Sequence, residues 1–383
     1  MTGLVVHSAR KLDADGLVDD FWLVADDDTI VATGAGAGWH DAARVPGREV
    51  VDAHGHWLTP GFIDLHCHGG GGFAFDGGPD ELLAALATHR AHGTTRSVVS
   101  HLASPFHVLC ENLGIVADLA ETDPLVLGSH LEGPFLAVER RGAHDAAYLR
   151  EPGPEMVEEL LGAARGTLRV TTLAPELPNA LETIGVLTEA GVVVAVGHTA
   201  ADFDQAARAF EVGARLLTHA FNAMNGVHHR APGPVVAAID NPEVTLELIL
   251  DGLHVHPLVA KLLFTEAPGR VALVTDAMAA AGATDGDYRL GGLNVTVREG
   301  LAVLSGTATI AGSTLTLDHA LRNAVERVGL PPARAVEALT LVPARVLGLE
   351  HRLGRLSRGY AADAVILDHE WNVRRVFADG RAL

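Results

Sequence analysis

The sequence has few cysteines, few basic residues and no long apolar run, and each shortage excludes a class of protein. Two cysteines in 383 residues cannot build a disulfide framework, so the fold must depend on a buried core, as is typical of a reducing compartment. Lys and Arg number 28 against 48 Asp and Glu, and a formal net charge of −20 excludes a basic surface for nucleic acid or an anionic membrane. No apolar run reaches the ~18 residues of a membrane-spanning helix, and the opening MTGLVVHSARKLDADG lacks the features of a secretory signal. We therefore expect a cytoplasmic protein that binds neither nucleic acid nor membranes.

The sequence is long, apolar and rich in histidine. With 383 residues and 48% hydrophobic side chains, the chain can form a large α/β barrel with an appendage, or two ordinary domains. It also contains 21 histidines, whose meaning depends on where they lie.

The two ends of the chain share a pattern of short strands separated by turns. We predict that residues 1–56 and 346–383 form one small β-sandwich domain, with the rest of the chain inserted between them. The alternative is that the two ends only decorate the central domain. The Gly/Ala run at 34–38 is interpreted as a turn, because no amphipathic helix follows it as a dinucleotide-binding loop would require.

Residues 57–345 alternate short apolar runs with alanine-rich helical stretches, which is typical of βαβ units around a parallel sheet. Alternation of this length favours a closed (β/α)8 TIM-like barrel over an open sheet. A long loop at 279–312 has a hairpin pattern and is expected to help cover the site. The predicted strands are 61–65, 94–99, 125–130, 168–174, 192–197, 214–218, 245–250 and 271–275, and the main predicted helices are 80–92, 105–121, 154–164, 180–190, 202–212, 257–266, 313–328 and 332–339.

The first barrel strand ends in a pair of histidines, His66 and His68. Side chains two residues apart on a strand point to the same face, so both imidazoles project together while Cys67 points away. Paired neutral nitrogen donors at the end of a strand suit a divalent metal ion. A lone His-x-His pair is common in proteins that bind no metal, however. A metal site is therefore predicted only if other residues of metal-binding type lie near the pair.

Four further strand ends carry residues of metal-binding type. Barrel enzymes keep their active sites at the carboxyl ends of the strands, so these side chains should converge on one face. They are Glu132 after the third strand, His198 after the fifth, His219 after the sixth and Asp276 after the eighth.

This order of residues resembles the amidohydrolase superfamily, and longer strings narrow the resemblance to the family of N-acetylglucosamine-6-phosphate deacetylases. The resemblance covers nearly the whole chain, and its most distinctive strings are LEGPF and HAFNAM. In chain order the strings are LEGPF (131–135), RGAH (141–144), GHT (197–199), HAFNAM (219–224), DGLH (251–254) and TDAM (275–278).

The resemblance implies a site for one or two divalent metal ions per subunit. Glu132, His198 and His219 would hold the principal ion. His66 and His68 would hold a second, with Glu132 bridging the two ions and Asp276 near enough to contribute. Mixed histidine and carboxylate ligands favour Zn and also admit Fe, Mn or Co.

The resemblance also implies the reaction, which is deacetylation of N-acetylglucosamine 6-phosphate to glucosamine 6-phosphate and acetate. Metal-bound hydroxide would attack the amide carbonyl, with Asp276 as general base and then general acid. His144 would stabilise the oxyanion together with the metal, or alternatively would only orient the sugar.

Substrate recognition has to bring an anionic sugar phosphate to an acidic protein. Arg230 is the expected phosphate ligand, because a guanidinium offers paired charge-assisted donors and this residue follows His219 in a basic segment. The resemblance further implies a homodimer, in which residues near His228 and His229 could reach a neighbouring site. The other residues expected to contact the substrate are Ala143, His144, Asn222, Ala223, Asp251, His254, Thr309, Ile310 and Ala311.

Two alternatives remain at this stage. Another amidohydrolase, either a cyclic-amide hydrolase or a deaminase, would share the metal ligands but not the segment from HAFNAM to Arg230. A non-catalytic relative that only binds a sugar phosphate would have no need of Asp276.

Overall fold

The computed structural model describes residues 3–383, which form two compact units. One unit contains the chain up to residue 64, residues 89–96 and residues 317–383. The other contains residues 65–88 and 97–316. Across residues 3–383, none of the helices combines the length and apolar character needed to cross a membrane.

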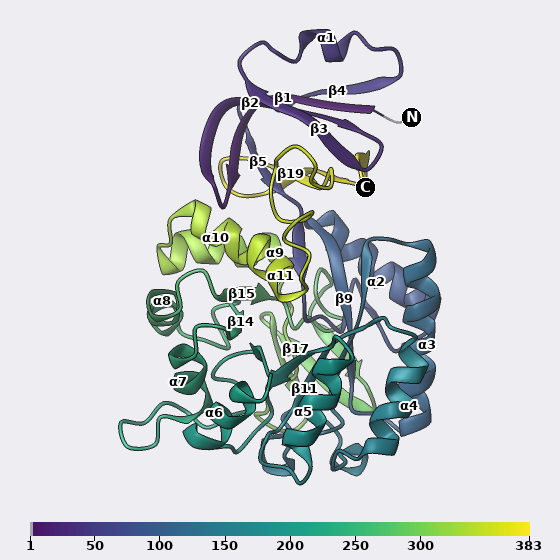
Figure 1. Ribbon diagram of the computed structural model, residues 1–383, viewed down its shortest axis with the longest axis vertical. Coiled ribbons are helices and arrows are strands. Elements are labelled where there is room, and N and C mark those ends of the chain that lie inside the picture. The colour runs from purple at the N-terminus through teal and green to yellow at the C-terminus, as the bar shows by residue number, and fades with distance from the viewer. Residues whose placement is uncertain (1–2) are drawn as a thin grey trace. The chain divides into compact units, whose positions relative to one another are not determined.

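The first unit is built on a sheet that joins the two ends of the chain. Figure 1 shows strands from the start of the chain, in purple, beside strands from its end, in yellow. The junction is the antiparallel pair formed by β5 and β19, in which Leu58 lies opposite Ile366. The sheet order is β21-β20-β19-β5-β1-β2-β3, with β4 paired to β1. The strands are β1 (Gly3–Asp13), β2 (Gly16–Asp26), β3 (Thr29–Ala35), β4 (Arg48–Asp52), β5 (Trp57–Pro60), β19 (Ala364–Leu367), β20 (Val373–Ala378) and β21 (Arg381–Ala382).

Alternation along these strands creates the core of the sheet. Leu4 and Val6 of β1 point to one face and pack with Leu23, Ile30 and Phe377 in a single buried cluster. At residues 3–64 and 317–383 the unit also holds helices α1 (His40–Ala43), α9 (Leu317–Asn323), a π-helical turn (Ala324–Val328), α10 (Pro332–Leu339) and α11 (Leu341–Val346).

All four tryptophans of the chain, Trp22, Trp39, Trp57 and Trp371, lie in this unit. Trp57 and Trp371 stack with their ring centroids 5.3 Å apart, and the Arg10 guanidinium lies over Trp57 at 4.1 Å. Trp22 lies so close to Gly34 that a Cβ atom there would be 2.4 Å from the indole, so a side chain at this position is excluded.

The second eight-stranded sheet is the predicted parallel barrel. Its strand order, β15-β14-β13-β12-β11-β10-β9-β6, follows the sequence. The ring closes next to His66, whose carbonyl oxygen accepts a hydrogen bond from the Asp276 amide at 2.8 Å, and the His68 amide donates to Ala277 at 2.8 Å. The strands are β6 (Phe62–Asp64), β9 (Thr94–Leu102), β10 (Val126–Glu132), β11 (Leu168–Leu173), β12 (Val193–Val196), β13 (Leu216–Leu217), β14 (Thr245–Ile249) and β15 (Val271–Val274).

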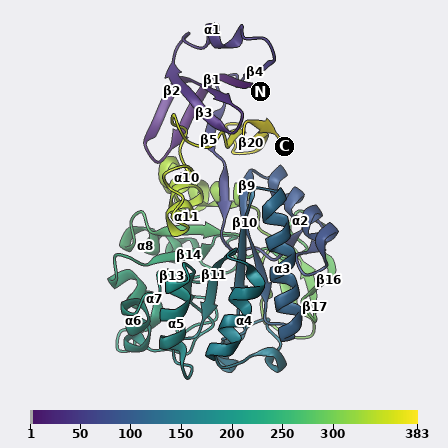
Figure 2. The same cartoon turned by 45° about the vertical axis from the view of Figure 1, so that its right-hand side comes forward.

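Helices cover the outer side of the barrel strands, as Figure 2 shows for α3 to α5. The predicted (β/α)8 barrel with a small β domain formed by both chain ends is therefore confirmed. The helices are α2 (Pro79–Ala91), α3 (Phe106–Thr122), α4 (Pro154–Ala164), α5 (Ala180–Glu189), α6 (Phe203–Glu211), α7 (Gly233–Asp240) and α8 (Pro257–Glu266), with single helical turns at Val138–Arg140 and Ala146–Tyr148.

Two helical predictions need correction. The helix expected at 313–328 begins only at Leu317, because Ser313 is extended and its amide donates to the Asp276 carbonyl at 2.7 Å. Helix α7 was not expected, since it is short and opens on Gly233 and Pro234.

A small antiparallel sheet fills the long loop after β15, as its hairpin pattern predicted. It consists of β16 (Gly286–Leu290), β17 (Leu293–Arg298) and β18 (Leu301–Leu304), and a short hairpin of β7 (Gly69–Gly70) and β8 (Phe73–Ala74) follows His68. Leu290, Val295 and Val297 of the small sheet bury against Met278 and Ala143. The insertion is thereby packed onto the segment that carries Asp276.

Candidate metal centre

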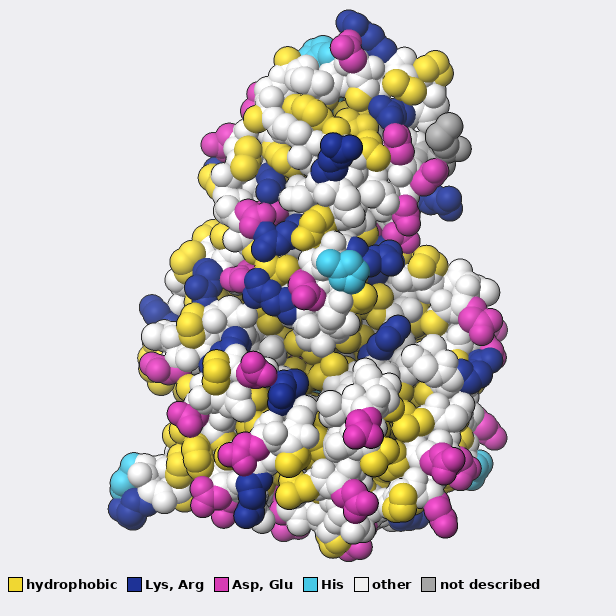
Figure 3. Space-filling model, in the orientation of Figure 1, with side chains coloured by type: hydrophobic (Ala, Val, Ile, Leu, Met, Phe, Trp, Pro, Cys, Tyr) yellow, Lys and Arg dark blue, Asp and Glu magenta, His cyan; other side chains and the backbone are white. Residues whose placement is uncertain are grey.

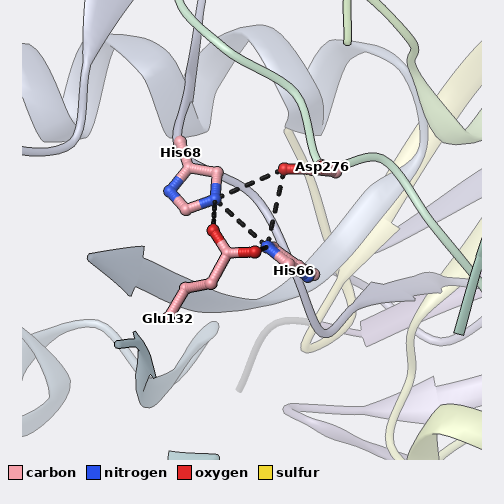
Figure 4. A group of neighbouring side chains, drawn as sticks. All are labelled: His66, His68, Glu132 and Asp276. Atoms are coloured by element: carbon pink, nitrogen blue, oxygen red, sulfur yellow. Dashed lines mark hydrogen bonds and ion pairs between the residues drawn. The ribbon is translucent and has the colours of Figure 1, made fainter. Parts of the chain in front are cut away.

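His66, His68, Glu132 and Asp276 form a buried tetrad at the carboxyl ends of the barrel strands. His66 and His68 follow β6, Glu132 is the last residue of β10, and Asp276 follows β15. In Figure 4 the two imidazoles, the carboxylate of Glu132 and that of Asp276 all point toward one another. His68 Nε2 lies 3.0 Å from Glu132 Oε2 and 3.3 Å from Asp276 Oδ1, and His66 Nε2 lies 3.3 Å from Glu132 Oε1 and 3.5 Å from Asp276 Oδ1.

A second group shares Glu132 with this tetrad. Oε1 of Glu132 lies 3.0 Å from His198 Nε2 and 3.1 Å from His219 Nε2. Because Glu132 directs its two oxygens to both groups, it is placed to bridge two cations.

The donor sets fit divalent metal ions. In each group the candidate ligand atoms all lie within 4.8 Å of one another, and every residue is buried. His66 Nε2 and His68 Nε2 face each other at 3.1 Å, a distance at which two imidazole lone pairs repel unless a cation or a proton lies near them. Histidine nitrogens with carboxylate oxygens are ligands that Zn, Fe, Mn and Co accept.

The electrostatics of the tetrad point to the same conclusion. Burial disfavours charge on both imidazoles, but the neighbouring carboxylates outweigh it, raising the pKa of His68 to about 9 and the pKa of His66 well above its usual value. Burial likewise opposes the charge of Glu132, yet His66 and the hydrogen bonds of His144 and His198 hold the pKa of Glu132 well below its usual range. The ion-free carboxylates thus attract positive charge, and a divalent cation would take the place of the bound protons.

Several site residues adopt left-handed backbone conformations. His198, His219 and Asp276 have φ values of 47°, 25° and 47°, and Phe221 and Ala223 share the region. Such conformations cost on the order of 1–3 kcal/mol each for residues other than glycine, and they cluster at functional sites. Here they turn the chain at the strand ends so that the side chains face inward.

A cavity of about 490 Å³ opens onto these ligands. His66, Asp251, Ala311 and Arg230 are absent from its lining, whereas Arg140 and Arg141, which were not predicted as site residues, are part of it. The predicted site residues that do line the cavity are His68, Glu132, His198, His219, Asp276, Ala143, His144, Asn222, Ala223, His254, Thr309 and Ile310.

Two predicted residues outside the lining still support it. Asp251 lies behind His254, with its Oδ2 2.7 Å from His254 Nδ1, and Ala311 is fully buried in the cluster under the small sheet. Burial opposes the charge of His254, but the hydrogen bond and charge of Asp251 raise the pKa of His254 above its usual value.

Arg230 does not reach the cavity of its own chain. It is exposed, as are its neighbours at 226–231, and its guanidinium lies 2.6 Å from the His229 ring. In Figure 1 the connection between β13 and α7 extends away from the barrel unit, and Figure 3 shows basic and histidine side chains gathered there.

His144 is buried between the cavity wall and Glu132. Its Nδ1 accepts a hydrogen bond from the Ala103 amide at 3.3 Å, so the ring proton resides on Nε2, which faces Glu132 Oε2 at 3.4 Å. Burial lowers the pKa of His144 to about 4. The ring is therefore a neutral hydrogen-bond donor in the wall of the cavity, with Nε2 facing Glu132.

Orientation of the ligand rings comes from partners that the sequence did not reveal. His198 Nδ1 lies 2.9 Å from the backbone carbonyl of Arg140, and His66 Nδ1 lies 3.2 Å from Glu247 Oε2. Both contacts leave Nε2 directed at the metal-binding groups.

Comparisons with known proteins show the family to which the chain belongs. A sequence model of the amidohydrolase family matches residues 57–383. Among curated relatives, N-acetylgalactosamine-6-phosphate deacetylase of Escherichia coli O157:H7 is 37% identical over 98% of both chains, and N-acetylglucosamine-6-phosphate deacetylase of Bos taurus is 36% identical over 87% of this chain and 84% of its own. The solved structure of a single-residue mutant of N-acetyl-D-glucosamine-6-phosphate deacetylase from Mycobacterium smegmatis, in complex with N-acetyl-D-glucosamine 6-phosphate, superposes with a TM-score of 0.93 at 40% identity, covering 100% of this chain and 99% of that one.

Proposed function

Because the chain belongs to the amidohydrolase family, we propose that it is a hydrolase that removes the acetyl group from N-acetylglucosamine 6-phosphate. The products are glucosamine 6-phosphate and acetate. The observation that carries the proposal is that two histidine–carboxylate groups share Glu132 and contribute side chains to a single cavity whose wall includes Asn222 and His254.

Divalent metal ions complete the site in this proposal. Glu132, His198 and His219 would hold the principal ion, and His66 and His68 would hold a second together with Glu132 and Asp276. A bound ion polarises the amide carbonyl and lowers the pKa of water. Zn is our first choice, and Fe, Mn or Co would accept the same ligands.

Asp276 handles the proton in the proposed reaction. Its carboxylate faces the cavity, accepts a proton from the attacking water and returns it to the amide nitrogen as the C–N bond breaks. The water oxygen becomes part of acetate, and the protonated nitrogen leaves as the sugar amine.

His144 supplies a hydrogen bond rather than a proton. Its neutral ring donates from Nε2, so it can stabilise the carbonyl oxygen as negative charge develops there. The alternative role is to orient the sugar ring through the same donor.

The phosphate group of the substrate requires positively charged side chains close to the cavity, because the chain as a whole is acidic. Arg140 and Arg141 line the cavity of their own chain. Arg230 extends from its own barrel unit on an exposed loop, so we propose a homodimer in which this loop of a second copy brings Arg230 to the phosphate. We also place the protein in the cytoplasm, in keeping with its two cysteines.

A second candidate substrate is N-acetylgalactosamine 6-phosphate, because the Escherichia coli relative named for that substrate matches 98% of the chain. It differs from the first only in the configuration of one hydroxyl group, and both would give acetate. Acetate release on each sugar phosphate, normalised to metal content, decides between them.

The same assay tests the function as a whole. We expect acetate release that requires metal, with neither ring opening of cyclic amides nor ammonia release from nucleobases. Release of ammonia instead would identify a deaminase, ring opening of a cyclic amide would identify a cyclic-amide hydrolase, and binding without acetate release would identify a non-catalytic relative.

A further inference from the structure

Glu247 is a buried carboxylate that the proposed reaction does not use. It lies in β14 between Leu246 and Leu248, is 0% exposed, and does not line the cavity. A carboxylate without compensating partners is costly in a barrel interior. We therefore expect neighbouring hydrogen-bond donors or positive charges to offset the cost of burying the Glu247 carboxylate.

One oxygen of Glu247 contacts ligands of both metal-binding groups. Oε2 lies 3.2 Å from His66 Nδ1 and 3.3 Å from the backbone amide of His219. The other oxygen, Oε1, has no hydrogen-bond partner within residues 3–383. Glu247 is thus one side chain shared by the tetrad and by the Glu132–His198–His219 group.

The contact with His66 has a direction. A carboxylate only accepts hydrogen bonds, so Nδ1 of His66 must carry the ring proton. Once a metal ion takes the place of the second proton, Nε2 offers its lone pair, and this atom faces His68, Glu132 and Asp276 at 3.1–3.5 Å. The carboxylate thereby holds the tautomer that a metal requires.

The contact with His219 acts through the backbone. His219 has a φ of 25°, and its amide donates to Glu247 Oε2, while the next amide, that of Ala220, donates to the Glu247 carbonyl at 2.8 Å. Both bonds hold the turn that directs the His219 ring toward Glu132.

Neighbouring groups do not duplicate this role. His130 packs its ring against His66 at a centroid distance of 4.6 Å, but its nitrogens bond Ser100 and Thr172. His198 is oriented by the backbone carbonyl of Arg140. Of these three histidines, only His66 has a side-chain carboxylate bonded to the ring nitrogen that faces away from the metal-binding groups.

We propose that Glu247 is a positioning residue that determines whether the His66–His68 position holds a metal ion. It fixes the ring of His66, steadies the turn at His219, and adds a third carboxylate beside Glu132 and Asp276 to balance two divalent cations. The inference rests on the proposed metal site, but it does not depend on which sugar is the substrate.

Zn²⁺ binding to chelator-treated protein tests the proposal without any sugar. We expect two ions per chain in the parent protein. Glu247→Met should weaken one of the two by about 10–100-fold, so that one ion per chain remains at intermediate Zn²⁺. Glu247→Gln keeps an acceptor oxygen for His66 and should weaken the same ion less. Thr171→Val is the matched control, because it also replaces a buried polar side chain of a barrel strand, and it should bind both ions normally.

A second measurement reports on the ring itself. Long-range ¹⁵N–¹H NMR of histidine-labelled, ion-free protein reports the protonation and hydrogen bonding of each ring nitrogen, and the Nδ1 signal of His66 should change in Glu247→Met but not in Thr171→Val. The proposal is overturned if folded Glu247→Met binds both Zn²⁺ ions as tightly as the parent, or if the parent binds only one. Absence of acetate release with two-ion binding intact would instead refute the proposed substrate and leave the role of Glu247 standing.

Discussion

Nε2 of His198 and Nε2 of His219 lie 3.0 Å apart, and both face the same oxygen of Glu132. The three groups come from the ends of three different barrel strands, so the barrel itself sets their spacing. Two imidazole nitrogens and one carboxylate oxygen this close define a place for a cation before any ion arrives.

Removal of a principal ligand should therefore remove metal and activity together. In His219→Ala we expect bound metal and acetate release each to fall by roughly 100-fold or more, since the ion contributes several kcal/mol to the reaction. Metal analysis and the acetate assay on the same preparation check this. His107→Ala, which changes an exposed histidine of α3, should leave both unchanged, and an active metal-free His219→Ala protein would contradict the site.

Asp276→Asn should separate proton transfer from metal binding. The amide keeps the size of the side chain but cannot take up a proton, so turnover should fall on the order of 10²–10⁴-fold. Zn²⁺ at the Glu132–His198–His219 group should persist, because Asp276 is not part of that group. Near-normal turnover with the ion in place would rule out Asp276 as the base.

The pair formed by Asp251 and His254 should make stability depend on pH. Burial opposes both charges, but the hydrogen bond between them raises the pKa of His254 and lowers that of Asp251. The ionised Asp251 stabilises the folded protein fully above its usual pKa of about 3.8, and this stabilisation is lost as the pH falls through its lowered pKa. The charged His254 stabilises the folded protein fully below its usual pKa of about 6.5, and this stabilisation is lost as the pH rises through its raised pKa.

Between those limits both contributions are complete, so Asp251→Asn should cost most stability near pH 5–6 and less near pH 9. Asparagine retains an acceptor for the amides of Leu253 and His254, which Asp251 Oδ1 binds at 2.8 and 2.9 Å, so the turn is preserved. Urea unfolding followed by circular dichroism at several pH values measures the difference. A cost that is the same at every pH would show that the charge of the pair is irrelevant.

Arg230→Ala should impair recognition of the phosphate specifically. Losing a charge-assisted contact of ~1.5–3 kcal/mol predicts a KM for the sugar phosphate raised by about 10–100-fold, with little change for unphosphorylated N-acetylglucosamine. Arg208→Ala, an exposed arginine of α6, removes the same charge and serves as the control. Equal losses on both sugars would contradict phosphate recognition by Arg230.

The sequence was sufficient to predict the barrel and the grouping of the candidate metal ligands, for a physical reason. Strand ends in a parallel barrel meet at one face, so a histidine or carboxylate at the end of a strand can be assigned to the site without knowing any contact. His66, His68, Glu132, His198, His219 and Asp276 all follow this rule.

The rule for strand ends does not identify site residues whose role depends on contacts between distant parts of the barrel. Glu247 is 181 positions from His66 and lies inside an apolar strand, so its contact exists only once the ring closes. Arg140 and Arg141 follow a strand whose end had already been assigned to Glu132. For Arg230, proximity in sequence to His219 did not place the side chain in the cavity of its own chain, and its role stays a prediction.

The confinement of all four indoles to the unit formed by the chain ends has a spectroscopic consequence. Intrinsic tryptophan fluorescence reports on that unit alone, and quenching or shifts of its emission are insensitive to what happens at the barrel ligands. Circular dichroism reports on both units, because the other unit also contains helices such as α3 to α8. Denaturation curves recorded by the two methods will therefore coincide only if the two units unfold in one transition. A difference between the two midpoints would show that the barrel unit unfolds separately from the unit formed by the chain ends.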